Sequence, residues 1–175
     1  MPTETIEVLE QTYVIDPAHS SAAFAVAHNG HALFRCWFTN IEGELSDGVL
    51  RGTVDVSSIA IGMEKFREHV LASEFFNAES APKLRFESTR LELSGQDLEV
   101  HGSLTIREVT KPVVARGRAT TAIDAFGQER LALSLGAVVD RRDFGMTWQM
   151  PLPGGGDALG HDVDITVELA LTRQS

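Results

Sequence analysis

Apolar and polar residues alternate with a period of two along much of this chain, and no other feature limits its fold as strongly. The alternation is clearest in residues 98–106, 131–139 and 163–171, where every second residue is apolar or glycine. Successive side chains of a β-strand point to opposite faces, so this pattern is typical of strands with one buried face. The chain is therefore predicted to be an all-β protein of half-buried antiparallel strands.

Weaker alternation and turn signals extend this prediction to the rest of the chain. Short polar turns such as Ser46-Asp47-Gly48 and Phe126-Gly127-Gln128 separate neighbouring segments, which favours hairpin connections. We expect about eight strands, arranged as an antiparallel up-and-down barrel or as a sandwich. The weaker segments are residues 13–15, 22–28, 35–45, 50–56, 84–86 and 113–123.

One segment, residues 62–76, interrupts the β-pattern. Met63, Phe66 and Val70 follow helical spacing, and charged residues occupy the opposite face. Two adjacent phenylalanines come next, before the extended pattern returns. We predict a short helical lid near residues 62–76, because an amphipathic cover on a β-protein indicates an apolar interior that serves as a binding site.

Small residues recur on the faces predicted to point inward. Large inward side chains fill the interior of a small barrel, whereas small ones leave room for one ligand. The alternative is a packed interior, in which the glycines relieve strand curvature and the alanines pack against large partners. The small inward residues are Ala22, Gly102, Ala115, Gly117, Ala119 and Ala137.

Composition narrows the classes of partner and of cellular location. With 25 acidic and 15 basic residues the chain carries a formal charge of −10, which disfavours nucleic acid and anionic lipid surfaces. Cys36 is the single cysteine, which excludes an internal disulfide and a zinc site of paired thiolates. Residues 1–10 do not resemble a secretion signal, and no apolar run is long enough to cross a bilayer. We expect a cytoplasmic protein that does not span a membrane.

Motifs for catalysis are missing from the sequence. It has no nucleophile elbow, phosphate-binding loop or dinucleotide fingerprint, so no catalytic residues, cofactor or metal site are predicted. The cluster Asp140-Arg141-Arg142-Asp143 is interpreted as an ion-pair latch at a strand end. Two alternatives are a metal-dependent enzyme that uses His19, His28 and His31, and a stress-associated interaction module with a solid barrel.

A series of short motifs follows a specific order from about residue 13 to residue 171. They are Tyr13 to Ser20 followed by Phe24 and His28, Phe38 and Gly43, Ser58-Ile59, His69 with Phe75-Phe76, Pro82 to Phe86, residues 102–106, residues 109–113, Asp140 to Gly145, and Gly160 to Val167. In their order and spacing these motifs resemble those of the YceI family. The resemblance implies a lipocalin-like barrel that binds polyisoprenoid and related long-chain lipids. It implies one domain over residues 12–175 after an N-terminal extension of residues 1–11, and it allows a homodimer.

The chain departs from the family pattern at three places. Phe66-Arg67 stands where Arg-Asp is common, Glu108 stands where glycine is usual, and Cys36 also replaces a glycine. The first change makes the lid more apolar, so the lid is expected to favour the apolar tail of a ligand over a polar head.

Together these observations lead to one hypothesis. The chain is a non-enzymatic protein that transports, stores or senses a long-chain isoprenoid, an isoprenoid quinone or a fatty lipid inside its barrel. His28 and His69 are the predicted head-group contacts. The predicted ligand-binding residues are Phe24, Val26, His28, Phe38, His69, Phe75, Phe76, Phe86, Leu104, Ile106, Phe144, Met146 and Trp148.

Overall fold

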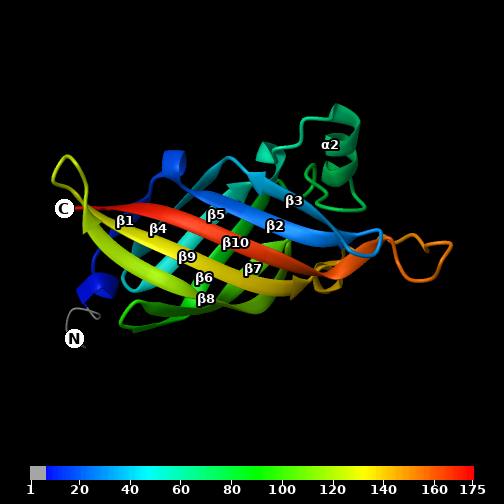
Figure 1. The fold of residues 1–175 in the computed structure, drawn as a ribbon. Coiled ribbons are helices and arrows are strands. Elements are labelled where there is room, and N and C mark those ends of the chain that lie inside the picture. Colours follow the sequence, from blue (N-terminus) through cyan, green and yellow to red (C-terminus); the bar gives the residue numbers. More distant parts are fainter. Residues whose placement is uncertain (1–6) are drawn as a thin grey trace.

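The structure is a computed structural model that describes residues 7–175, so residues 1–6 of the expected N-terminal extension lie outside it. Ten strands form one antiparallel sheet, with one α-helix and three short 3-10 helices between them (Figure 1). The strands are β1 (Tyr13–Ile15), β2 (Ser21–His28), β3 (Ala32–Phe38), β4 (Ile41–Ser46), β5 (Val49–Asp55), β6 (Lys83–Ser94), β7 (Asp97–Ile106), β8 (Val109–Ile123), β9 (Glu129–Asp140) and β10 (Leu159–Arg173). The helices are η1 (Pro17–His19), η2 (Val56–Ser58), α2 (Glu64–Leu71) and η3 (Arg141–Phe144).

The sheet closes because β1 pairs with strands on both of its sides. Tyr13 lies opposite Leu45 of β4 and opposite Arg173 of β10. Strand β10 pairs with β2 near its start and with β1 near its end, so β1 and β2 act as one strand interrupted by η1. In the same way, β3 and β4 act as one interrupted strand, because β3 pairs with β2 and β4 pairs with β1. The ten strands thus form a closed antiparallel barrel of eight strands, as predicted.

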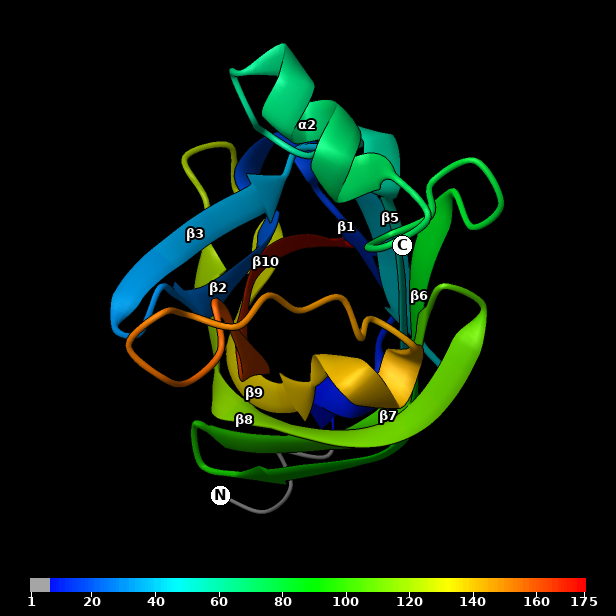
Figure 2. The same ribbon diagram turned by 90° about the vertical axis from the view of Figure 1, so that its right-hand side faces the viewer.

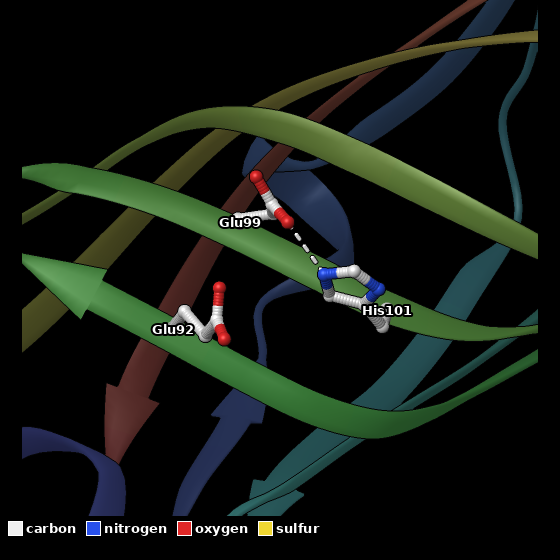
Figure 3. Close-up of side chains that lie close together, drawn as sticks. All are labelled: Glu92, Glu99 and His101. Carbon is white, nitrogen blue, oxygen red and sulfur yellow. Dashed lines mark hydrogen bonds and ion pairs between the residues drawn. The ribbon is translucent and has the colours of Figure 1, made fainter.

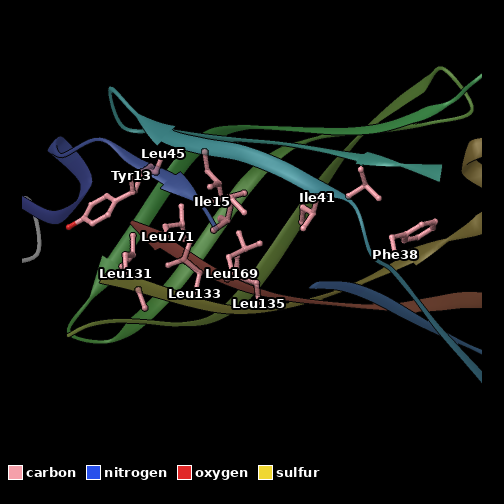
Figure 4. Close-up of a cluster of buried hydrophobic side chains, with 14 of the residues drawn as sticks. Tyr13, Ile15, Phe38, Ile41, Leu45, Leu131, Leu133, Leu135, Leu169 and Leu171 are labelled. Atoms are coloured by element: carbon pink, nitrogen blue, oxygen red, sulfur yellow. The ribbon is translucent and has the colours of Figure 1, made fainter. Parts of the chain in front are cut away.

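One end of the barrel is filled with apolar side chains (Figure 4). Tyr13, Leu45, Leu131 and Leu171 are all no more than 1% exposed there. Val8 and Leu9, from the helical turn at residues 7–10, pack against this cluster. We call this region the solid end. Close packing here is what the strong leucine alternation of β9 and β10 predicts, since leucines from neighbouring strands meet inside the barrel.

The wall of the barrel divides near the opposite end, which we call the mouth. There β2 ends at His28 and η3 follows β9. Strand β3 pairs with β2 but not with β5, and helix α2 lies over the space between β3 and β5 (Figure 2). The helical insertion predicted near residues 62–76 is therefore confirmed, and it closes a gap in the side wall at the mouth.

Candidate functional site

The barrel contains a cavity of about 520 Å³ between the solid end and the mouth. Ligand-binding pockets commonly measure about 300–1,000 Å³. Its wall consists of the inward faces of the strands together with α2, η3 and the segment that follows η3. The interior is thus divided into a packed half and a hollow half. This division disagrees with the alternative of an interaction module whose barrel is solid.

Some of the small inward residues create this space and others do not. Ala22, Ala115 and Ala137 line the cavity, as the cavity hypothesis predicts. Gly102 instead accommodates the ring of Phe86, because a Cβ at Gly102 would overlap that ring. The remaining two belong to packing: Gly117 permits close approach of the backbone at Ser134, and Ala119 lies in the solid end. For these three residues the packing interpretation holds.

Every residue predicted from the sequence to contact a ligand lies on the cavity wall. Their contact with a ligand stays a prediction, but the strands and the insertion bring all of them to one place. They are Phe24, Val26, His28, Phe38, His69, Phe75, Phe76, Phe86, Leu104, Ile106, Phe144, Met146 and Trp148.

Aromatic rings form the part of the wall beneath α2. The ring of Phe24 on β2 lies 5.9 Å from that of Phe34, 6.0 Å from that of Phe38 and 5.9 Å from that of Phe76, measured between centroids. Phe66 of α2 continues the group through Phe34, at 5.2 Å. Aromatic pairs at such distances contribute roughly 0.5–1.5 kcal/mol each beyond their burial, so they hold α2 against β2 and β3.

A second aromatic group links the insertion to the opposite side of the mouth. The His69 ring lies 5.0 Å from the ring of Phe75 and 5.8 Å from that of Trp148, and Phe75 lies 5.5 Å from Trp148. His69 and Phe75 belong to the insertion, whereas Trp148 follows η3, so this contact spans the mouth. His69 and His28 are both exposed, which places the two predicted head-group residues at the cavity rim.

The charged cluster after β9 separates into two parts with different roles. Arg142 pairs with Asp140, with Nη2 at 2.6 Å from Oδ2, and this guanidinium lowers the pKa of Asp140 to about 2. That pair agrees with the predicted ion-pair latch. Arg141, by contrast, is buried and lines the cavity. The predicted latch also included Arg141 and Asp143, and that part of the prediction is wrong, because neither residue forms an ion pair within residues 7–175. The sequence held one signal for Arg141 in the cavity wall, the nearby Phe144 and Met146, which were predicted to face the ligand.

Phe34 and Phe66 are further wall residues that were not predicted as ligand contacts. Both had a usable signal. Phe34 alternates with Cys36 and Phe38 along β3, and Phe66 lies on the apolar face already recognised for the insertion. Alternation in β9 and β10 likewise places Leu135 and Val163 on the wall.

Histidines 19, 28 and 31 do not form a metal-binding cluster in residues 7–175. The only group of three potential ligands whose atoms lie within 4.8 Å of one another there is Glu92, Glu99 and His101, on β6 and β7 (Figure 3). Arginines already contact both carboxylates of this group. Arg90 pairs with Glu92 at 3.2 Å, Arg116 pairs with Glu99 at 3.0 Å, and His101 lies 2.5 Å from Glu99. The arrangement is that of a surface ion-pair network.

Within residues 7–175 no helix has both the length and the apolar character required to traverse a bilayer.

Comparison with known proteins shows which family has this arrangement. A UPF0312 protein of Shewanella sp. strain W3-18-1 is 29% identical over 168 residues, which cover 89% of this chain and 85% of that protein. The crystal structure of Burkholderia cenocepacia BcnA superposes with a TM-score of 0.69 at 17% identity, covering 89% of this chain and 98% of that one. A polyisoprenoid binding domain from Saccharophagus degradans superposes with a TM-score of 0.71 at 12% identity, covering 94% and 99%. The family model of the YceI-like domain matches residues 13–171, and the chain therefore belongs to the YceI family.

Proposed function

We propose that the protein binds a long-chain apolar lipid, such as a polyisoprenoid or an isoprenoid quinone, in the barrel cavity. The observation that carries this proposal is a cavity of about 520 Å³ whose lining is almost entirely aliphatic and aromatic. Such a space favours an apolar occupant, because water inside it would lack hydrogen-bond partners. The Saccharophagus degradans domain with the same fold, described as polyisoprenoid binding, supports this choice of ligand class.

Apolar burial alone can supply the affinity. Removal of one methylene group from water contributes roughly 0.8 kcal/mol, so a five-carbon isoprene unit contributes about 3–4 kcal/mol before the costs of association. Those costs amount to roughly 4–15 kcal/mol, which a chain of several units offsets without many polar contacts.

Binding, as transport, storage or sensing, is proposed in preference to catalysis. Among the cavity-lining residues of the described chain there is no aspartate, glutamate, serine, threonine, cysteine, lysine or tyrosine. The wall therefore supplies neither a side-chain nucleophile of the usual kind nor a carboxylate to orient His28 or His69 as a base.

The decisive experiment is purification without detergent, followed by extraction with organic solvent and mass spectrometry of the extract. We expect a lipid with a long apolar chain to accompany the protein at near-stoichiometric amounts. Repeated recovery of lipid-free protein that takes up no added isoprenoid would rule out the proposal.

A substitution in the cavity wall tests where the lipid sits. Phe86→Glu places a carboxylate in the apolar cavity opposite Leu104, and we expect it to reduce lipid uptake at least tenfold, because the buried charge is poorly solvated. Thr89→Glu adds the same charge at an exposed position of the same strand and should retain uptake. Circular dichroism of both variants checks that they are folded, and equal uptake by two folded variants would contradict a ligand at Phe86.

A further inference from the structure

Within residues 7–175, the charged residues that line the cavity are all basic, although the chain as a whole is acidic. Acidic residues outnumber basic ones by 25 to 15 in the sequence, yet no aspartate or glutamate is found among the cavity-lining residues of the described chain, and three arginines are. Two of these arginines belong to the outer surface. Arg51 and Arg85 have half-exposed side chains that pair with Glu87 and Glu108. Arg141 differs from both, because it is only 4% exposed.

The guanidinium of Arg141 is held by backbone carbonyl groups. Its Nε donates to the Gly160 carbonyl at 2.7 Å, its Nη1 to the Met146 carbonyl at 2.6 Å and its Nη2 to the Leu159 carbonyl at 3.4 Å. These contacts fix the guanidinium where η3, the segment after it and the start of β10 meet at the mouth. A guanidinium has five N–H donors, so the three contacts leave two for another acceptor.

No carboxylate within residues 7–175 forms an ion pair with Arg141. Asp140 contacts Arg142 instead, and Asp157 lies 3.7 Å from His161. Both carboxylates act on Arg141 only through longer-range attraction, while burial lowers the pKa of its guanidinium. An arginine remains protonated even so. A buried cation without a counter-ion is costly, and an anionic ligand would relieve that cost.

We propose that Arg141 binds the oxyanion of a ligand head group, so that the preferred ligand is an anionic amphiphile with its apolar tail in the cavity. This inference rests on the proposed lipid binding and specifies its ligand class. The planar guanidinium fork suits phosphate and carboxylate oxygens, and its position at the mouth leaves the interior for the tail. Head-group recognition is thereby assigned to η3 and not to the insertion that carries His69.

The test compares two ligands with the same tail. Binding of geranylgeranyl monophosphate and of geranylgeraniol is measured by displacement of a fluorescent fatty probe, with inorganic phosphate as a third competitor. We expect the monophosphate to bind about tenfold or more tightly than the alcohol, as charge-assisted hydrogen bonds imply. Inorganic phosphate, which has no tail, should fail to displace the probe.

Two neighbouring arginines provide the matched variants. Arg141→Gln should reduce the preference for the monophosphate to about twofold or less, and Arg142→Gln should retain it. The two substitutions change the net charge equally, but Arg142 is half exposed and paired with Asp140. Arg141→Lys, which keeps the charge, should retain part of the preference. If Arg141→Gln does not fold, the lysine variant and the ligand pair on the natural protein still decide the result.

Each outcome separates this inference from the proposed function. Equal binding of the monophosphate and the alcohol overturns the role of Arg141 and leaves lipid binding intact. Failure of both ligands to bind overturns the proposed function itself. Displacement by inorganic phosphate alone would indicate a site for the free anion. A preference that survives in Arg141→Gln would reduce Arg141 to a structural clamp on η3.

Discussion

At the scale of single residues, Tyr13 joins the solid end to the surface. It is the only tyrosine of the chain and is fully buried, and its hydroxyl donates to Glu129 Oε1 at 3.0 Å. Glu129 also pairs with Arg173 at 2.5 Å. Burial and the neighbouring Glu129 carboxylate raise the pKa of Tyr13 from 10.0 to about 12, since both oppose the charged phenolate.

This pKa shift predicts a loss of stability in alkali. The folded protein holds the phenolic proton of Tyr13 more tightly than the unfolded chain does. The contribution of this residue to the free energy of unfolding is therefore fully present below pH 10 and is lost as the pH rises through about 12. In Tyr13→Phe we expect the free energy of unfolding to fall less steeply over this interval, and to be about 1–2 kcal/mol lower at neutral pH. Denaturant unfolding at several pH values measures both effects.

The absorbance of tyrosinate provides a direct check, because no other tyrosine contributes to it. We expect its midpoint near pH 12 in the folded protein and near pH 10 after unfolding. A midpoint of 10 in the folded state would contradict the buried, Glu129-bonded position.

Arg107 and Glu108 adopt backbone conformations that usually favour glycine. They form the two-residue turn between β7 and β8 and have φ angles of 55° and 61°. Tight hairpins of this kind require the left-handed region, where glycine is favoured, which agrees with the glycine usual at the position of Glu108. Both side chains make contacts that glycine could not make: Arg107 donates to carbonyl groups of the helical insertion, and Glu108 pairs with Arg85.

At the scale of elements, α2 depends on its surroundings. It has eight residues, its N-cap Met63 forms no side-chain hydrogen bond, and helices this short are unstable alone in water. Val70 is buried, and Phe66 packs on Phe34. Nη1 of Arg107 donates to the carbonyl of Ser73 at 2.6 Å and to that of Phe75, which ties the segment after α2 to the β7–β8 turn.

Loss of this connection should loosen the insertion selectively. In Arg107→Ala we expect amide hydrogen exchange in residues 64–78 to accelerate by about tenfold or more, since the carbonyls lose charged donors, while the solid end keeps its protection. Arg51→Ala is the control, because its guanidinium pairs with Glu87 on the outer surface. Acceleration spread evenly over the barrel would mean that the insertion does not open as a separate unit.

At the scale of the whole molecule, the barrel divides stability and binding between its two ends. The solid end buries leucines from several strands at 0–4% exposure, whereas the cavity half leaves apolar surface without partner atoms. Such unmade contacts weaken the hollow half, and a ligand that fills the cavity restores them. Ligand binding is thus expected to contribute to stability as well as to function.

Removal of bound lipid should therefore lower the melting temperature. At a free ligand concentration about a hundredfold above Kd, binding stabilises the folded state by about 2.7 kcal/mol, which corresponds to a rise in Tm of roughly 5–10 °C. Differential scanning calorimetry of natively purified, solvent-stripped and reloaded protein measures the difference. Phe86→Glu should show no such shift on reloading, and an unchanged Tm in the natural protein would argue against a buried ligand.

Much of the wall could be predicted because its signals are local. Inward and outward residues follow from the period of two, so Phe24, Leu104 and Ile106 could be assigned to the interior from their neighbours alone. The insertion was equally accessible, because Phe66 and Val70 follow the helical period. The role of Gly102 could not be predicted in this way. An inward glycine can either leave empty space or accommodate a neighbouring ring, and only the position of Phe86 distinguishes these two roles.

The sequence by itself determined an antiparallel barrel and the direction of most of its side chains. Its alternation, its turns and its one amphipathic insertion were sufficient, because these features depend on neighbours within a few residues. Tertiary structure alone decided that the interior is packed at one end and hollow at the other, since volume depends on side chains from distant strands. It also separated Arg141 from Arg142. The two arginines are adjacent in the sequence, but Arg141 is buried among carbonyl groups from residues 146–160, whereas Arg142 pairs with Asp140 at the surface. Their burial differs because it depends on which distant segments fold over each residue.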